Sequence, residues 1–129
     1  MDAQGKVADG SALSEIVTGV EQVGGCTVVR LRGELNVGQR GELERVLREL
    51  FETTGTRVVL DCAALGFVAS AGLGTLVGMQ KLSRQKGGSL CMAAARGPIV
   101  SLMKMTRLEQ VIPMFESVEQ AIAADVRED

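Results

Sequence analysis

Ser70 is the one reactive side chain in the stretch "FVASAGLG", residues 67–74, where most neighbours carry little or no side chain. A serine hydroxyl becomes a nucleophile when a base takes its proton, and the usual base is histidine. The chain contains no histidine, and the nearest carboxylate before Ser70 is Asp61. The G-x-S-x-G turn of serine hydrolases is not matched, because Val68 occupies its first glycine position. These residues do not favour an enzyme, and we predict no catalytic residue.

Gly72 and Gly74 follow a hydrophobic run and open a helical pattern, as glycines do in nucleotide-binding loops. The dinucleotide fingerprint needs a third glycine three residues later, and a P-loop needs a G-K-[ST] sequence; the chain has neither. Its three cysteines, Cys26, Cys62 and Cys91, lack the spacing of metal ligands and lie in apolar, strand-like runs. We therefore expect no cofactor, no metal, and three buried, reduced thiols.

Two interpretations of Ser70 remain. Serine is a favoured helix N-cap, because its oxygen accepts a hydrogen bond from a backbone N–H two or three residues later. A cap does not explain why Ala69, Ala71, Gly72 and Gly74 surround the hydroxyl with so little side chain. Small residues around an exposed hydroxyl let another protein approach the backbone closely, so we predict a protein-binding surface.

The composition limits the other functions. With 129 residues the chain has the size of one domain, and its formal charge of −2 provides no chain-wide basic field for nucleic acid. No apolar run approaches the ~18 residues of a membrane span, and the first residues do not resemble a signal peptide. We expect a cytoplasmic protein without direct membrane insertion or a nucleic-acid partner. Residues 1–14 should form a flexible tail and residues 15–129 a single domain.

The hydrophobic pattern alternates between strand and helix periods. Residues 16–23 and 26–32 are typical of strands, and Gly24-Gly25 between them favours a tight hairpin. A helix is predicted over 43–51, a strand over 58–60, a helix over 71–86 and a strand over 90–93. Pro98 begins a further helix, a strand follows at 111–115, and Ser117 with Gln120 caps the last helix.

The predicted order is β-β-α-β-α-β-α-β-α. It indicates an α/β fold with a mixed four- to five-stranded sheet, an opening β-hairpin and about four helices. The core should include six aliphatic residues: Val29, Leu31, Leu47, Val59, Leu60 and Leu76.

Four segments carry a family resemblance: "RLRGELN", "VVLDCAALGFVASAGLGTLVG", "KGGSL" and "RLEQVIPMFESVEQAI". Together, over roughly residues 16–125, they resemble the STAS domains of bacterial anti-sigma factor antagonists. The resemblance implies a sheet with helices packed on it, as the pattern independently suggests. It also implies phosphorylation of a Ser or Thr at the start of the second helix, in the motif Asp-Ser-[Ser/Thr]-Gly-Leu-Gly. Ser70 matches the acceptor, and Gly72, Leu73 and Gly74 match the end of the motif.

Three positions depart from the family pattern. Ala69 stands in place of the motif's Asp, and Ala71 in place of its second hydroxyl residue. Asn36 stands in place of the Asp that closes the family's Gly-Glu-Leu-Asp. Two carboxylates expected near the site are therefore missing.

The resemblance implies partner switching. The unphosphorylated antagonist would bind an anti-sigma factor that is also a serine-protein kinase, and phosphorylation of Ser70 would release it until a phosphatase reverses the change. The implied partner-binding residues are Asn36, Ala69, Ser70, Ala71, Gly72, Leu73, Gly74 and Met79. The departures leave an alternative open, a non-phosphorylated STAS accessory subunit that docks on an ATPase of a phospholipid-transport or sensory complex.

Overall fold

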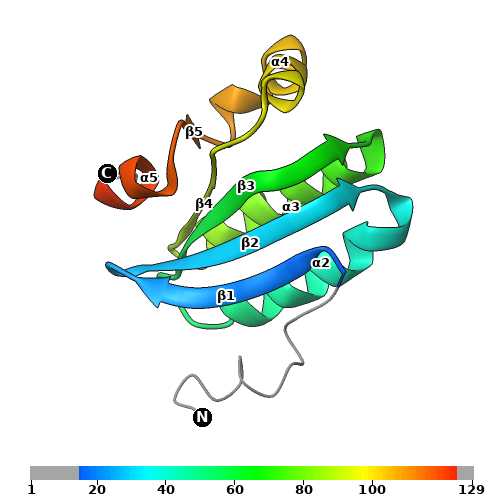
Figure 1. Cartoon of the computed structure of the whole chain (residues 1–129). Coiled ribbons are helices and arrows are strands. Elements are labelled where there is room, and N and C mark those ends of the chain that lie inside the picture. Colours follow the sequence, from blue (N-terminus) through cyan, green and yellow to red (C-terminus); the bar gives the residue numbers. More distant parts are fainter. Residues whose placement is uncertain (1–14, 125–129) are drawn as a thin grey trace.

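The computed structural model describes residues 15–124 of the chain (Figure 1). It opens with strands β1 (Val17–Val23) and β2 (Cys26–Leu35), which pair antiparallel. Between them Gly24 and Gly25 have φ angles of 57° and 85°, a region that glycine adopts without strain. The predicted hairpin is therefore confirmed.

The remaining elements are α2 (Val37–Phe51), β3 (Arg57–Val68), α3 (Ser70–Gln85), β4 (Ser89–Ala93), α4 (Gly97–Met105), the 3₁₀ helix η1 (Leu108–Gln110), β5 (Met114–Phe115) and α5 (Val118–Ala123). The strands form one sheet in the order β1-β2-β3-β4-β5. Only the β1–β2 pair is antiparallel, and the other neighbours are parallel. The predicted element order and the mixed α/β fold are confirmed.

Helices α2 and α3 lie side by side on one face of the sheet and bury the main core (Figure 1). Every residue predicted for the core is 2% exposed or less: Val29, Leu31, Leu47, Val59, Leu60 and Leu76. Five of the six belong to this main core, whereas Val59 belongs to a second cluster.

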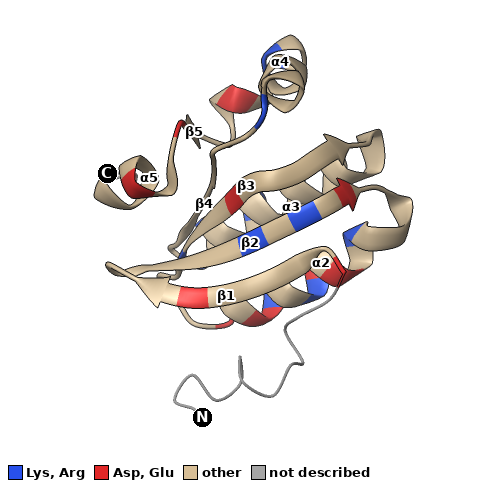
Figure 2. Cartoon of the chain, viewed as in Figure 1, with Lys and Arg blue, Asp and Glu red and all other residues tan. Residues whose placement is uncertain are grey.

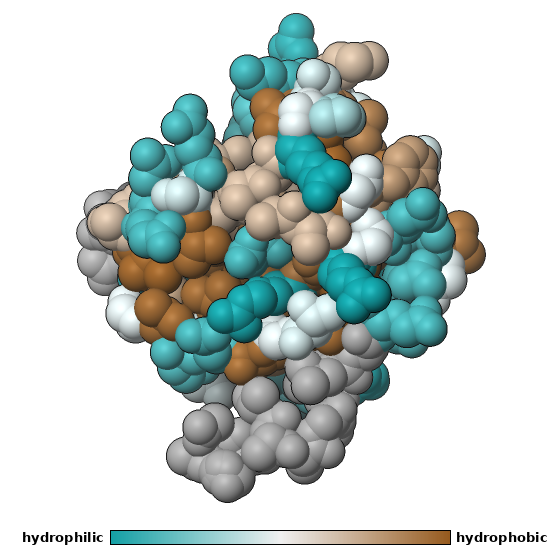
Figure 3. Space-filling view, in the orientation of Figure 1, coloured by the Kyte–Doolittle hydropathy of each residue, from teal (hydrophilic) through white to brown (hydrophobic). Residues whose placement is uncertain are grey.

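Helix α5 covers part of the opposite face of the sheet. A second buried cluster lies beneath it, formed by Cys26, Val28, Val59, Cys91, Ala93 and Ala121. Val28 is therefore buried on this face, and the three cysteines are buried and free as predicted. On this face hydrophobic residues gather between the hairpin end and α5, while the rest of the sheet carries hydrophilic residues mixed with residues of intermediate hydropathy (Figure 3).

Strand β3 is much longer than predicted and ends one residue before α3. Its register against β2 shifts twice, between Arg30 and Arg32 and between Gly33 and Glu34, with the additional residues on β3. Such bulges bend a strand and break the alternation of buried side chains. Most of the segment between residue 60, where the predicted strand ends, and Ser70 is therefore strand.

The last strand is shorter than predicted. The N–H groups of Val111 and Ile112 donate to the Leu108 carbonyl at 2.9 and 2.8 Å, so these residues belong to a helical turn. Pro113 has no N–H, and its carbonyl accepts from Met92 at 3.0 Å. Strand β5 is therefore a two-residue strand at the sheet edge, a position that tolerates a neighbouring proline.

Candidate functional site

The site lies where the parallel strands β2 and β3 end and their helices begin (Figure 1). Leu35 and Val68 are the last residues of the two strands and form the last pair in register. Asn36 and Ala69 follow them, and the Ala69 N–H donates to the Leu35 carbonyl at 2.9 Å. The fold thus brings Asn36 and Ser70 together at the carboxyl ends of β2 and β3, although they are distant in sequence.

Asn36 caps the first of these helices. Its Oδ1 accepts a hydrogen bond from the Gly38 N–H at 2.9 Å, and its backbone is extended as an N-cap requires. Asparagine therefore performs at this position the capping that an aspartate would perform, but without the negative charge.

The second helix, α3, begins without such a cap. Its N-cap residue is Ala69, which has extended backbone but no side-chain oxygen, so no side chain accepts from the N–H groups of the first turn. The interpretation of Ser70 as the N-cap is therefore wrong by one residue, because the helix begins at the serine itself. The Ser70 hydroxyl is exposed beside the positive end of the helix dipole.

The glycines of α3 have two different surroundings. A Cβ added at Gly72 would lie 2.7 Å from the Leu35 Cγ and 2.8 Å from the Leu35 carbonyl oxygen. Gly72 is therefore needed for the close packing of α3 on the end of β2, not for contact with another protein. Gly74 is exposed, and apart from its chain neighbours and the backbone of its own helix no heavy atom of the described residues lies within 4 Å of an added Cβ, so its surroundings are open.

Met79 does not belong to an exposed surface. It is 3% exposed and packs in the main core, because it lies one helical turn after Leu76 on the buried side of α3. Its place among the predicted partner-binding residues is therefore wrong. Ala69, Ala71 and Leu73 are half-buried, so each retains some accessible surface.

Two exposed apolar residues near this edge were not predicted. Phe67 is 52% exposed on β3, three residues before Ser70, and Val37 is 70% exposed directly after Asn36. Phe67 pairs with Glu34 in the β2–β3 register. The next pair, Leu35 with Val68, is buried and ends both strands. The only sequence signal for these residues was their proximity to Ser70 and Asn36.

The structure gives no geometric support for catalysis by Ser70 with Asp61 as its base. Asp61 lies seven residues before the end of β3, which at ~3.3 Å per residue places it roughly 20 Å from the start of α3. Its Oδ1 accepts instead from the Ala63 N–H at 3.1 Å. Within residues 15–124, no group of acidic and cysteine side chains could hold a metal ion, and no helix is long and apolar enough to cross a membrane.

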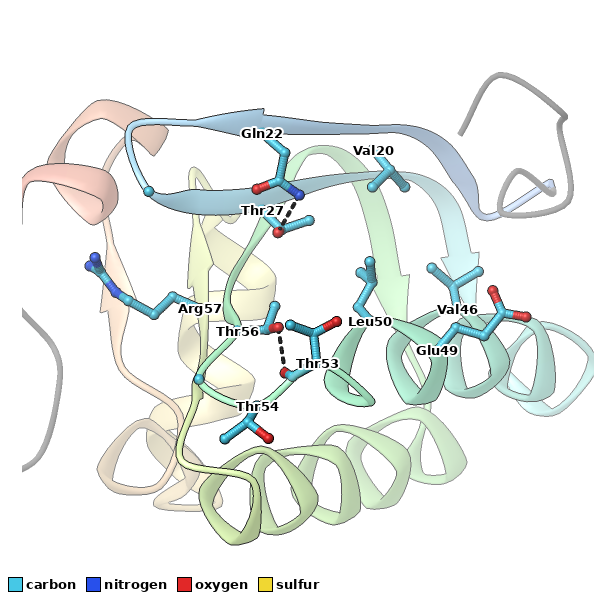
Figure 4. A pocket seen from close by; sticks show the side chains of 12 residues that line it. Val20, Gln22, Thr27, Val46, Glu49, Leu50, Thr53, Thr54, Thr56 and Arg57 are labelled. Atoms are coloured by element: carbon cyan, nitrogen blue, oxygen red, sulfur yellow. Dashed lines mark hydrogen bonds between the residues drawn. The ribbon is translucent and has the colours of Figure 1, made fainter. Parts of the chain in front are cut away.

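A separate cavity lies at the other end of the sheet, between the hairpin and the end of α2 (Figure 4). Several of its polar groups are paired within the protein: Gln22 donates to the Thr27 hydroxyl at 2.8 Å, and Thr56 donates to the Thr53 carbonyl at 2.7 Å. The Arg57 side chain points away from the cavity and donates to the Ala124 carbonyl at 3.0 Å. These internal hydrogen bonds do not favour a ligand site in this cavity.

An antiparallel hairpin leading into a parallel sheet, with helices packed on it, defines a mixed α/β domain. The family model for the STAS domain matches residues 18–121, and the chain belongs to this family. It is 29% identical over 99 residues to the anti-sigma F factor antagonist of Paenibacillus polymyxa. The aligned region covers 76% of this chain and 85% of that protein.

Solved structures show the same fold. The chain is similar to an anti-sigma factor antagonist from Mycobacterium paratuberculosis, with a TM-score of 0.73 and 24% identity over 85% of this chain and 94% of that one. It is also similar to the Bacillus cell fate determinant SpoIIAA in its phosphorylated form, with a TM-score of 0.62 and 20% identity over 80% of this chain and 94% of that one. The fold that the resemblance implied is therefore confirmed.

Proposed function

We propose that this protein is an anti-sigma factor antagonist that acts by partner switching. Unphosphorylated, it binds an anti-sigma factor through the sheet edge around Ser70, and phosphorylation of Ser70 ends the complex. The observation that carries the proposal is an exposed hydroxyl on the first residue of an uncapped helix, beside the open surroundings of Gly74. The name of the Paenibacillus polymyxa relative and the phosphorylated form of SpoIIAA support it.

The partner would bind a surface that we name the contact edge. It consists of residues at the ends of β2 and β3 and the starts of α2 and α3: Asn36, Val37, Phe67, Ala69, Ser70, Ala71, Leu73 and Gly74. The exposed Val37 and Phe67 provide apolar area, and the small residues allow close backbone approach. Gly72 acts indirectly, because it lets α3 pack on β2.

The free domain can accept a phosphate at Ser70. A phosphoserine carries about −1.5 to −2 charges at neutral pH. The first-turn N–H groups of α3 have no side-chain acceptor, and the helix dipole places positive charge there. The phosphate oxygens would accept from these groups, so the modification need not unfold the domain.

The same phosphate opposes binding of a closely packed partner. Removing a dianion from water without a compensating partner costs several kcal/mol. A loss of about 3 kcal/mol corresponds to a roughly hundredfold weaker complex. The partner would be an anti-sigma factor with serine-protein kinase activity, a phosphatase would restore the binding state, and the cycle would take place in the cytoplasm.

A second candidate function follows from the residues that differ from the family motif. Ala69 and Asn36 remove two carboxylates beside Ser70, and a kinase that recognises them would not modify this chain. In that case the contact edge would be a permanent docking surface for an ATPase of a phospholipid-transport or sensory complex. Pull-down distinguishes the two, since the partner is either an anti-sigma kinase or an ABC-type ATPase.

The deciding experiment is the intact mass of the protein purified from its native host, with and without phosphatase treatment. The proposal expects a phosphatase-sensitive increase of one phosphate that maps to Ser70 and is absent from Ser70→Ala. Purification from cells grown under several stress and starvation conditions controls for a transient modification. A protein that is unmodified in every condition, and that no host extract labels with radioactive ATP, would contradict the switch.

A further inference from the structure

Charge is distributed unevenly along this chain. Residues 70–113, from α3 to the segment before β5, contain six Lys and Arg residues and one acidic residue, whereas the rest of the chain contains eight basic and fifteen acidic residues. The formal charge of −2 therefore conceals a basic segment in an otherwise acidic protein. Figure 2 shows part of the contrast, with basic residues on α4 and acidic residues on and before α5.

The ion pairs formed within residues 15–124 all involve basic residues outside this segment. Arg30, Arg45 and Arg48 each form an ion pair with a glutamate. The six cations of the basic segment are all exposed, and none of them forms an ion pair with any residue in the part of the chain that the structure describes: Lys81, Arg84, Lys86, Arg96, Lys104 and Arg107. Their charge is therefore available to an external partner.

Two of these cations border a groove between the second half of α3 and η1. Lys81 and Arg84 lie along it, and its apolar part is formed by Val77 and the 39% exposed Val111. The two walls are joined beneath the surface, because the buried Gln80 donates to the Val111 carbonyl at 2.8 Å. The groove is therefore preformed, and a partner does not have to order its walls.

The groove continues the contact edge along the same helix. Residues spaced by four share a helix face, so Ser70, Gly74 and Gly78 form a row along α3. Gly78 is exposed, with no heavy atom within 4 Å of an added Cβ. Lys81 follows one turn later, about 16 Å from Ser70 at ~1.5 Å per residue, a distance that one interface of ordinary size covers.

We infer that this groove is the second half of the partner interface and that it binds an acidic amphipathic helix of the partner protein. The inference rests on the proposed function, since it assumes the same partner. An aliphatic side chain of that helix would lie between Val77 and Val111, and its carboxylates would meet Lys81 and Arg84. This surface suits a protein better than a nucleic acid, because its floor is apolar and none of the three phenylalanines of the chain lines it for base stacking.

The test uses a synthetic amphipathic peptide with leucines on one face and glutamates on the other, titrated into isotope-labelled full-length protein at low salt and followed by NMR. The backbone signals of Val77, Lys81, Arg84 and Val111 should shift with this peptide and not with a version in which glutamine replaces glutamate. Lys81→Gln/Arg84→Gln should weaken binding roughly three- to tenfold, as expected for two exposed ion pairs.

The matched control is Arg45→Gln/Arg48→Gln, which removes the same charge from the exposed face of α2 and should leave the affinity nearly unchanged. Equal binding of the glutamine peptide, or equal effects of the two double variants, would overturn the inference. So would tighter binding at this groove of a short RNA or of phosphatidylglycerol vesicles, because the partner class would then be wrong.

The outcome is separable from that of the proposed function. The peptide assay involves neither Ser70 nor a kinase, so it can succeed when Ser70 is never phosphorylated. Conversely, a partner complex that is ended by phosphorylation of Ser70 but keeps its full affinity with Lys81→Gln/Arg84→Gln would support the switch and refute the role of the groove.

Discussion

Gly72 and Gly74 lie two residues apart on α3 and should respond oppositely to the same substitution. A methyl group at Gly72 would be 2.8 Å from the Leu35 carbonyl oxygen, and this backbone atom, unlike the end of a side chain, has little freedom to move away. We expect Gly72→Ala to destabilise the protein by about 1–3 kcal/mol, the usual cost of overpacking. Gly74→Ala meets no atom from outside its own helix backbone within 4 Å and should gain up to about 1 kcal/mol from helix propensity.

Urea denaturation of the two variants measures this difference, which we expect to be about 1–4 kcal/mol. The thermal midpoints should separate accordingly, at roughly 4 °C per kcal/mol for a domain of this size. Equal stability of the two variants would refute the described packing of α3 against the end of β2. Gly74→Arg tests the role of this open space in partner binding. Its thermal midpoint should stay near that of the wild type, whereas partner binding should be abolished, because the arginine fills the open space at the contact edge.

Three further measurements test the core and the site. Leu60→Ala should cost about 2–5 kcal/mol in urea denaturation because it leaves a cavity in the central strand, and a loss below about 1 kcal/mol would contradict that placement. Burial raises the pKa of the Cys62 and Cys91 thiols from 9.0 to about 12, so both should resist DTNB until the protein unfolds. Stability should then fall as the pH rises above 9.0, since the unfolded thiols ionise there while the folded ones keep their protons. Ser70→Ala should stay within about 0.5 kcal/mol of the wild type and keep partner affinity, while Ser70→Asp should weaken binding in calorimetry; undiminished affinity of Ser70→Asp would count against the switch.

The parts of the fold that could be predicted from sequence are those set by local patterns. The Gly24-Gly25 pair specified the hairpin through backbone freedom, and the helical period specified the buried face of α2. The length of β3 could not be predicted in this way. Its core-facing residues after Leu60 are Cys62, Leu65 and Val68, and spacings of two, three and three residues do not follow the period of a regular strand.

The site was predicted less completely, for different physical reasons. A sequence pattern places the first residue of a helix only to within a residue or two. At α3 a shift of one residue changes the N-cap from Ser70 to Ala69. The error at Met79 was avoidable, because the helical period that buries Leu76 also buries the residue three positions later. The exposure of Phe67 depends on how far β3 extends beyond the covering helices, which only the tertiary structure reveals.

The absence of a carboxylate at Ala69 has a thermodynamic consequence for the proposed switch. The backbone of Ala69 is already extended, with φ −88° and ψ 171°, so Ala69→Asp should cap α3 and stabilise the unmodified protein by about 0.5–2 kcal/mol. The same carboxylate would compete with a phosphate on Ser70 for the first-turn N–H groups and would repel it. Phosphorylation should therefore raise the thermal midpoint of the wild type more than that of Ala69→Asp, which can be measured with phosphoserine incorporated at position 70. An equal increase in both proteins would mean that the phosphate does not use the uncapped helix start, and the free domain would need another way to accommodate its charge.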